Sequence, residues 1–136
     1  EGYRVVRKDG LYNLEDRKGG LLLHKWYPEV TPFAEGFARV RMADGLWNYV
    51  DHEGVALLHN GVQKAQAFSE GLAAVCKDGR WNYIRKDGYT IGRRWFEDAG
   101  PFVDGKATVQ YEGRQTRIDR EGRLQNEKKN NRGLGI

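Results

Sequence analysis

An all-β array of four repeats, each about 34 residues long, is the fold that this 136-residue sequence predicts. Three features predict it. Glycine recurs with a fixed period, short runs of alternating apolar and polar residues lie between the glycines, and no segment has the apolar spacing of an amphipathic helix. Solenoid-like stacking of the four units is the expected arrangement. A small four-bladed, propeller-like ring is the alternative, because the period fixes the unit and not the angle between units.

The glycines mark equivalent positions in the four units. The first glycine of each unit recurs at steps of 34, 35 and 34 residues, at Gly2, Gly36, Gly71 and Gly105. A phenylalanine follows the third glycine of a unit by fourteen residues on three occasions, at Phe33, Phe68 and Phe102. Most of the 18 glycines are therefore turn residues with a structural purpose.

Each unit is expected to be a three-stranded antiparallel meander. In the third unit the first strand is Leu72–Lys77, the second is Trp81–Arg85, and Asp78-Gly79 forms the turn between them. An Asp-Gly pair between alternating runs favours a type I′ turn, which requires positive φ at both central residues. The same turn is predicted at Asp9-Gly10, Asp44-Gly45 and Glu112-Gly113. Short third strands are predicted after the third glycine, at Leu21–Leu23, Val55–Leu58 and Tyr89–Ile91.

The repeats are expected to form a single domain over residues 1–124, with units at about 1–32, 33–67, 68–101 and 102–124. Residues 125–136 are expected to be a basic, disordered tail. In residues 1–122, by contrast, 19 basic and 18 acidic side chains are interspersed. Nucleic acid requires a clustered basic face, so no nucleic-acid partner is expected. No apolar run is long enough for membrane insertion.

The residues indicate no enzyme active site, cofactor or metal centre. Cys76 is the only cysteine, and no histidine is adjacent to it to activate the thiol. Ser69, the only serine, occupies a variable turn position, and the three histidines have no ligand-like spacing. Acids such as Glu35 and Glu70 recur beside the glycines, but no loop assembles a calcium-ligand sequence. Turn chemistry therefore explains these acids better than calcium binding does.

Aromatic residues are the main candidates for both the core and a binding surface. The structural core is expected to contain Trp47, Tyr49, Trp81, Tyr83, Phe33, Phe68 and Phe102. The alternative is that the strand aromatics form an exposed row for a sugar or a peptide. Two further aromatic pairs lie in connections with polar neighbours, where one ring of each pair would anchor the connection. The candidate partner-binding residues are Trp26, Tyr27, Arg93, Arg94, Trp95 and Phe96.

The repeated motif, F-x-E-G-L-A-x-V-x-x-D-G-x-W-N-Y-I/V-x-x-x-G, resembles that of the WG-repeat proteins of bacteria. The resemblance covers residues 1 to about 122, and Phe68–Ala73 and Gly79–Ile84 are its clearest stretches. The family usually has glycine after the tryptophan, whereas asparagine stands there in this chain, at Asn13, Asn48 and Asn82. The resemblance implies an all-β repeat architecture used mainly for interaction, and it implies no common enzyme activity.

A non-catalytic module that binds another protein, or another domain of a longer bacterial parent chain, is therefore the function expected first. A carbohydrate- or cell-envelope-binding module that uses exposed aromatic residues is the alternative. Cytoplasmic and envelope or periplasmic locations both agree with the sequence.

The two ends of the array differ in sequence. In the fourth unit Gln115-Thr116-Arg117 replaces the Trp-Asn-Tyr segment, as expected for a polar C-terminal cap. The first unit keeps Tyr12 and Leu14 but lacks a preceding aromatic residue. The parent chain is therefore expected to continue upstream and to cover this end. In the isolated fragment, the surface of the first unit around Tyr12 and Leu14 is expected to be sticky and to pair with a second copy through its unpaired strand edge.

Overall fold

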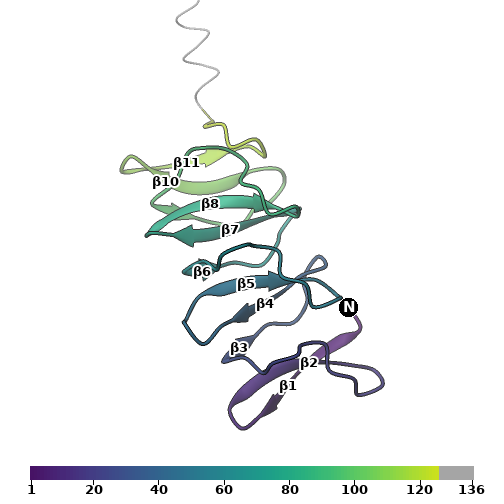
Figure 1. Cartoon of the computed structure of the whole chain (residues 1–136). Helices are drawn as coiled ribbons and strands as arrows, with labels where there is room; N and C mark the ends of the chain where they lie inside the picture. Colours follow the sequence, from purple (N-terminus) through teal and green to yellow (C-terminus); the bar gives the residue numbers. More distant parts are fainter. Residues whose placement is uncertain (126–136) are drawn as a thin grey trace, which may run out of the picture.

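The computed structural model describes residues 1–125, and within this range every regular element is a β-strand. The strands form four small antiparallel sheets, which follow one another in chain order along the body (Figure 1). The first sheet pairs β1 (Tyr3–Lys8) with β2 (Leu11–Asp16). The other three are β3 (Glu29–Val30), β4 (Ala38–Arg41) and β5 (Trp47–Val50); β6 (Lys64–Ala65), β7 (Leu72–Lys77) and β8 (Arg80–Arg85); and β9 (Asp98–Ala99), β10 (Ala107–Tyr111) and β11 (Arg114–Ile118).

The prediction of an all-β chain is therefore confirmed for the part that the structure describes. No helix in residues 1–125 is long and apolar enough to cross a membrane. The tail expected at residues 125–136 lies outside the described residues, apart from Gln125.

The third strand of each three-stranded sheet comes from the connection between units. β9 pairs with β10, with Asp98 opposite Gln110, and β3 and β6 pair with β4 and β7 in the same way. The segments after the third glycine, which were expected to supply this strand, make isolated bridges such as Ile84–Thr90. The predicted third strand is thus reduced to an isolated bridge to the second strand, and the strand that completes the sheet comes from the connection. A strand of two residues is too short to show alternation in a sequence.

The hairpin turns have the predicted type I′ geometry at three of the four expected positions. In each, the acidic residue and the glycine both have positive φ, for example 52° at Asp78 and 80° at Gly79. Asp44-Gly45 differs, because Asp44 is not among the described residues with positive φ. The Met42 N–H donates to the Leu46 carbonyl at 2.8 Å, so the turn is longer and absorbs one extra residue.

The apolar core consists of three clusters, and each cluster lies between two successive sheets. The middle cluster joins Tyr49 to Phe68, Ala73, Val75 and Ile84 of the following unit. The other clusters repeat this arrangement, with Leu14 against Ala38, Val40 and Val50, and Tyr83 against Phe102, Ala107, Val109 and Ile118. An internal sheet therefore gives one face to the unit before it and the other to the unit after it.

The aromatic residues expected in the core are buried to different degrees. Tyr49, Tyr83 and Phe102 are fully buried, and Phe68 is almost so. The Tyr49 and Tyr83 hydroxyl groups donate to the carbonyls of Gln66 and Gly100, and burial raises the pKa of both phenols. Trp47, Trp81 and Phe33 are only half-buried, and each packs against one of the apolar clusters. Both tryptophans lie near strand ends, where solvent reaches one side of the indole.

The asparagines that follow the aromatic residue of each second strand are buried and fully hydrogen-bonded. The Asn48 side chain donates to the Leu58 carbonyl at 2.9 Å and accepts hydrogen bonds from the Tyr49 and Leu58 N–H groups. Asn13 and Asn82 make equivalent bonds to the segments ten residues further on. Each asparagine therefore fixes the path of the chain after its own hairpin, a role the sequence did not predict.

Glutamates before the first glycine connect one unit to the next. The Glu35 carboxylate accepts hydrogen bonds from the Glu70 and Gly71 N–H groups, both at 2.9 Å. Glu70 accepts from Asp104 and Gly105 in the same way, and Glu1 accepts from Gly36. Three carboxylates, those of Glu1, Glu35 and Glu70, thus form a glutamate ladder along the body.

The glutamate ladder predicts sensitivity to acid. Burial would raise the pKa of Glu35, but the Gly71 and Glu70 N–H groups and the Lys86 ammonium together lower it below its ordinary value of 4.5. A lowered pKa stabilises the fold above the unfolded-state pKa, and this contribution is lost as the pH falls through the folded-state pKa. Glu35→Gln should therefore be less stable than the parent near neutral pH, and the difference should shrink in acid.

Urea unfolding of the parent and Glu35→Gln at a series of pH values from about 7 down to about 3 tests this expectation. The matched control is Glu53→Gln, because Glu53 is exposed and lies in a turn outside the glutamate ladder. A stability difference for Glu35→Gln that does not change with pH would contradict the role of the charged carboxylate.

Both outer faces of the described body carry polar side chains. In the first sheet, Arg4 and Glu15 occupy the positions of the buried Ala38 and Val50 and form an ion pair at 2.7 Å. In the last sheet, the exposed Arg117 occupies the position of the buried Tyr83. Leu14 is fully buried against the second unit, so the expectation that it lies on an exposed apolar surface is wrong.

Candidate functional site

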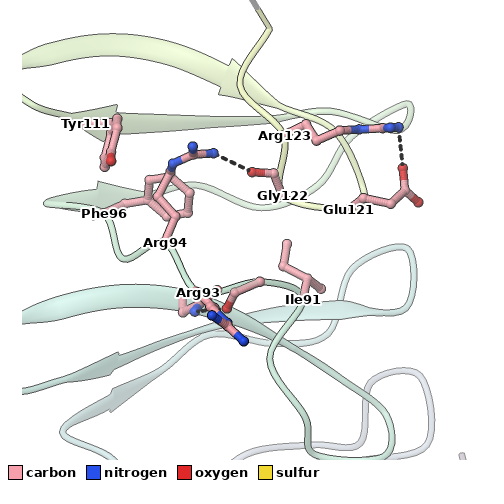
Figure 2. Close-up of a pocket in the computed structure, with 10 residues that line it drawn as sticks. Ile91, Arg93, Arg94, Phe96, Tyr111, Glu121, Gly122 and Arg123 are labelled. Carbon is pink, nitrogen blue, oxygen red and sulfur yellow. Dashed lines mark hydrogen bonds and ion pairs between the residues drawn. The ribbon is translucent and has the colours of Figure 1, made fainter. Parts of the chain in front are cut away.

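A pocket of about 420 Å³ lies between the third and fourth units. Its walls come from the connection after β8, from the end of β10 and from the turn after β11 (Figure 2). We call it the arginine pocket, and its lining includes Arg93, Arg94, Arg123, Phe96, Tyr111 and Ile91. It therefore combines three guanidinium groups with an apolar floor.

Two of the three arginines are held in place by described neighbours. Arg94 donates from Nη1 to the Gly122 carbonyl at 3.3 Å, and its guanidinium lies 5.3 Å from the centre of the Tyr111 ring. Arg123 forms ion pairs with Asp119 at 2.8 Å and with Glu121 at 3.1 Å. The Asp119 hydrogen bond is the main reason that the pKa of Arg123 is raised, so this guanidinium stays charged. Arg93 is exposed at the rim.

Phe96 forms the floor of the pocket and is not a contact residue. Its side chain is only 1% exposed, and the ring meets Tyr111 edge-on at a centroid distance of 5.7 Å. Its backbone exchanges two hydrogen bonds with Trp81, at 2.8 and 2.7 Å. Phe96 is thus the anchoring ring of its pair, and its inclusion among the partner-binding candidates is corrected.

Trp95, the other ring of this pair, borders a second hollow of about 230 Å³. We call this hollow the indole groove, and it is lined in part by His59, Asn60, Lys77, Thr90 and Trp95. The indole groove is the counterpart of the arginine pocket one unit earlier, because His59 and Asn60 occupy the positions of Arg93 and Arg94. Trp95 is half-buried there and keeps one side accessible.

The first aromatic pair lies at a different junction. Tyr27 exchanges backbone hydrogen bonds with Tyr12 and packs against the first apolar cluster, whereas Trp26 is half-buried in the position that corresponds to Trp95. The structure therefore brings Arg93, Arg94 and Phe96 together and leaves Trp26 and Tyr27 apart from them.

At the second connection, Gly61 occupies the position of Trp26 and Trp95. A Cβ added to Gly61 would lie 2.7 Å from the Cβ of Leu46. No indole fits at that position.

Tyr111 and Arg123 are among the residues of the arginine pocket that sequence reasoning missed. Both belong to the fourth unit and reach the pocket only because that unit stacks on the third. A comparison of equivalent positions could have found them, since Tyr111 replaces Lys77 and Arg123 replaces Tyr89.

Metal-binding chemistry has no support in the described part of the chain. No group of three or more histidine, cysteine or acidic side chains in residues 1–125 is placed to hold a metal ion. Cys76 is a buried free thiol whose sulfur lies 3.9 Å from the Gln63 side-chain oxygen.

Several solved structures resemble this chain in fold. The computationally designed Ika8 protein has a TM-score of 0.54 and 20% identity, over 91% of this chain and 45% of Ika8. BamB from Moraxella catarrhalis has a TM-score of 0.51 and 14% identity, over 90% of this chain and 48% of BamB. Hsv2 from Kluyveromyces lactis has a TM-score of 0.54 and 9% identity, over 87% of this chain and 42% of Hsv2. The chain thus spans about half the length of these proteins, and the likeness concerns the fold alone.

At the level of sequence, no curated protein matches the chain. The sequence model of the WG containing repeat, however, matches residues 16–47 and 62–81. The first match includes β3, β4 and the Asp44-Gly45 turn, and the second includes β6, β7 and the Asp78-Gly79 turn. Over residues 16–47 and 62–81 the chain thus matches the WG containing repeat, and there the resemblance that the glycine and aromatic motif indicates is confirmed.

Proposed function

We propose that the chain is a non-catalytic repeat module that binds another protein, or another domain of its parent chain, through the grooves between its units. The arginine pocket is the observation that carries this proposal. Interfaces between proteins are enriched in arginine and aromatic residues, and this pocket presents both on a fixed scaffold.

The variation between units supports an interaction role. Residues that build the scaffold are the same in successive units, as with the asparagine at Asn13, Asn48 and Asn82. Residues at the grooves differ, since the position of Arg93 is filled by His24 and His59 in earlier units. Repeat proteins commonly keep a constant scaffold and use a varied surface for recognition.

We extend the proposal to the arrangement of the units, which we describe as a solenoid-like stack of four. In support, each apolar cluster joins two successive units, and the sheets follow one another along the body in Figure 1. A stack of this kind exposes its grooves along one extended body, which suits a partner that binds as an extended chain.

A carbohydrate-binding module remains the second candidate, and one observation favours it. The indole groove places Trp95 beside the polar side chains of His59, Asn60 and Thr90. An indole face flanked by hydrogen-bonding groups is suited to a sugar ring, which has an apolar face and polar edges.

Parallel binding screens separate the two functions. The immobilised chain would be probed with a displayed random-peptide library and with a glycan array. We expect selected peptides whose binding falls in Arg93→Ser and persists in Arg17→Ser, a control at an exposed arginine of the first unit. Glycan binding that is lost in Trp95→Ala, without any selected peptide, would contradict the proposal and favour the carbohydrate module.

A further inference from the structure

We propose that the arginine pocket binds an extended segment of a partner protein in which an acidic residue lies next to an aromatic one. This inference rests on the proposed function and specifies the chemistry of the partner. The evidence is the use that the chain makes of the same groove one unit earlier, together with the charge and the shape of the pocket.

The indole groove shows what kind of side chain fits this position. There the groove between the second and third units is bordered by Trp95, which the connection between β8 and β9 supplies. The arginine pocket is the equivalent groove one junction later, between the third and fourth units. Its lining includes Ile91 and Tyr111, which lie beside the buried Phe96 and give an apolar surface for a ring. We therefore assign the aromatic residue of the partner to this surface.

The charge of the pocket indicates the second residue of the partner segment, the acidic one. Asp119 and Glu121 are both engaged by Arg123, so these carboxylates are already paired. Arg93 is exposed and has no ion pair among the residues that the structure describes. An arginine at the rim of a pocket favours a carboxylate, which it can bind through two parallel hydrogen bonds. We assign the acidic residue of the partner to Arg93.

Binding of short synthetic peptides to the full chain tests the inference. The parent peptide is acetyl-Gly-Ser-Glu-Trp-Ser-Gly-amide with a fluorescent label, and its two variants replace Glu by Gln or Trp by Ala. Fluorescence anisotropy should show binding of the parent peptide, and each variant should bind about tenfold more weakly, as expected for the loss of one charged hydrogen bond or one ring contact.

Matched protein variants locate the site. Arg93→Ser should bind the parent peptide about tenfold more weakly than the unchanged chain does. Arg17→Ser should change the affinity for this peptide by less than about twofold. The salt dependence of binding should also decrease in Arg93→Ser, because one ion pair is removed. Equal affinity for the Glu and Gln peptides, or unchanged affinity in Arg93→Ser, would overturn the inference.

Two other occupants would also overturn it, and each has its own measurement. A second copy of the chain would appear in analytical ultracentrifugation as concentration-dependent association that Arg93→Ser abolishes. Occupation by the acidic residue of the C-terminal segment would appear as a large gain in peptide affinity in Glu127→Gln. Should the displayed library instead select peptides without acidic or aromatic residues, the proposed function would stand and this inference would fail.

Discussion

Replacement of Tyr83 by alanine is expected to lower the free energy of unfolding by about 3–5 kcal/mol, the usual cost of removing a large buried ring. Tyr83 is fully buried in the third apolar cluster and meets Phe102 at a centroid distance of 4.9 Å. The cavity would lie between two units and would weaken their junction as well as the sheet. Urea unfolding followed by tryptophan fluorescence measures the change.

Two further variants separate the ring from its hydroxyl group. Tyr83→Phe keeps the ring and loses only the hydrogen bond to the Gly100 carbonyl, so a loss of about 1–2 kcal/mol is expected. Tyr89→Ala is the matched control, because Tyr89 is 71% exposed, and its effect should stay within about 0.5 kcal/mol. If Tyr83→Ala and Tyr89→Ala unfolded at the same urea concentration, the assignment of Tyr83 to the core would be refuted.

Replacement of Asn13 by alanine is the second large effect, with an expected loss of about 3 kcal/mol. The side chain is fully buried and donates to the carbonyls of Leu23 and Lys25, while it accepts from the N–H groups of Leu14 and Leu23. Alanine would leave several of these buried backbone groups without a partner, and that desolvation cost is larger than the worth of a typical hydrogen bond.

The control for Asn13→Ala is Asn60→Ala, because Asn60 is exposed in a connection and has no comparable hydrogen bonds among the described residues. Its unfolding midpoint should remain close to that of the parent. Amide hydrogen exchange adds a local measurement, since protection of the Leu23 N–H should fall in Asn13→Ala. Retained protection at Leu23 would show that the asparagine does not fix the path of this segment.

Local features of this fold could be predicted from the sequence, because turn glycines and the alternation of apolar and polar residues depend only on residues that are close in the chain. The type I′ turn at Asp78-Gly79 depends on two adjacent residues, and its positive φ angles are as expected. The role of Asn48 could not be predicted in the same way. Its partner, Leu58, lies ten residues further on, and the two meet only after the intervening loop has folded.

In the candidate site, too, the residues that are neighbours in the sequence were predicted and those that come from another unit were not. Arg93 and Arg94 stand beside an aromatic pair in the sequence and were therefore expected near a contact surface. Tyr111 and Arg123 come from the next unit, and only the stacking of the two units places them in the pocket. The half-buried Trp47 and Trp81 are a similar case, because alternation assigns a side chain to a face of a sheet but does not say how near it lies to the strand's solvent-exposed end.

The glutamate ladder is compatible with a change in the number of repeat units. Glu35 binds the turn at Glu70-Gly71 through backbone N–H groups, which every residue except proline can supply, so the contact is indifferent to most side chains in that turn. Excision of residues 36–70 would join Glu35 directly to Gly71 and would recreate a Glu-Gly turn. The first unit would then meet Ala73, Val75 and Ile84 in place of Ala38, Val40 and Val50, which are of the same chemical kind. A gene that encodes such a chain can therefore gain or lose a whole unit in one recombination event. The neighbouring units would still form the same apolar contacts and the same hydrogen bonds from glutamate to the backbone.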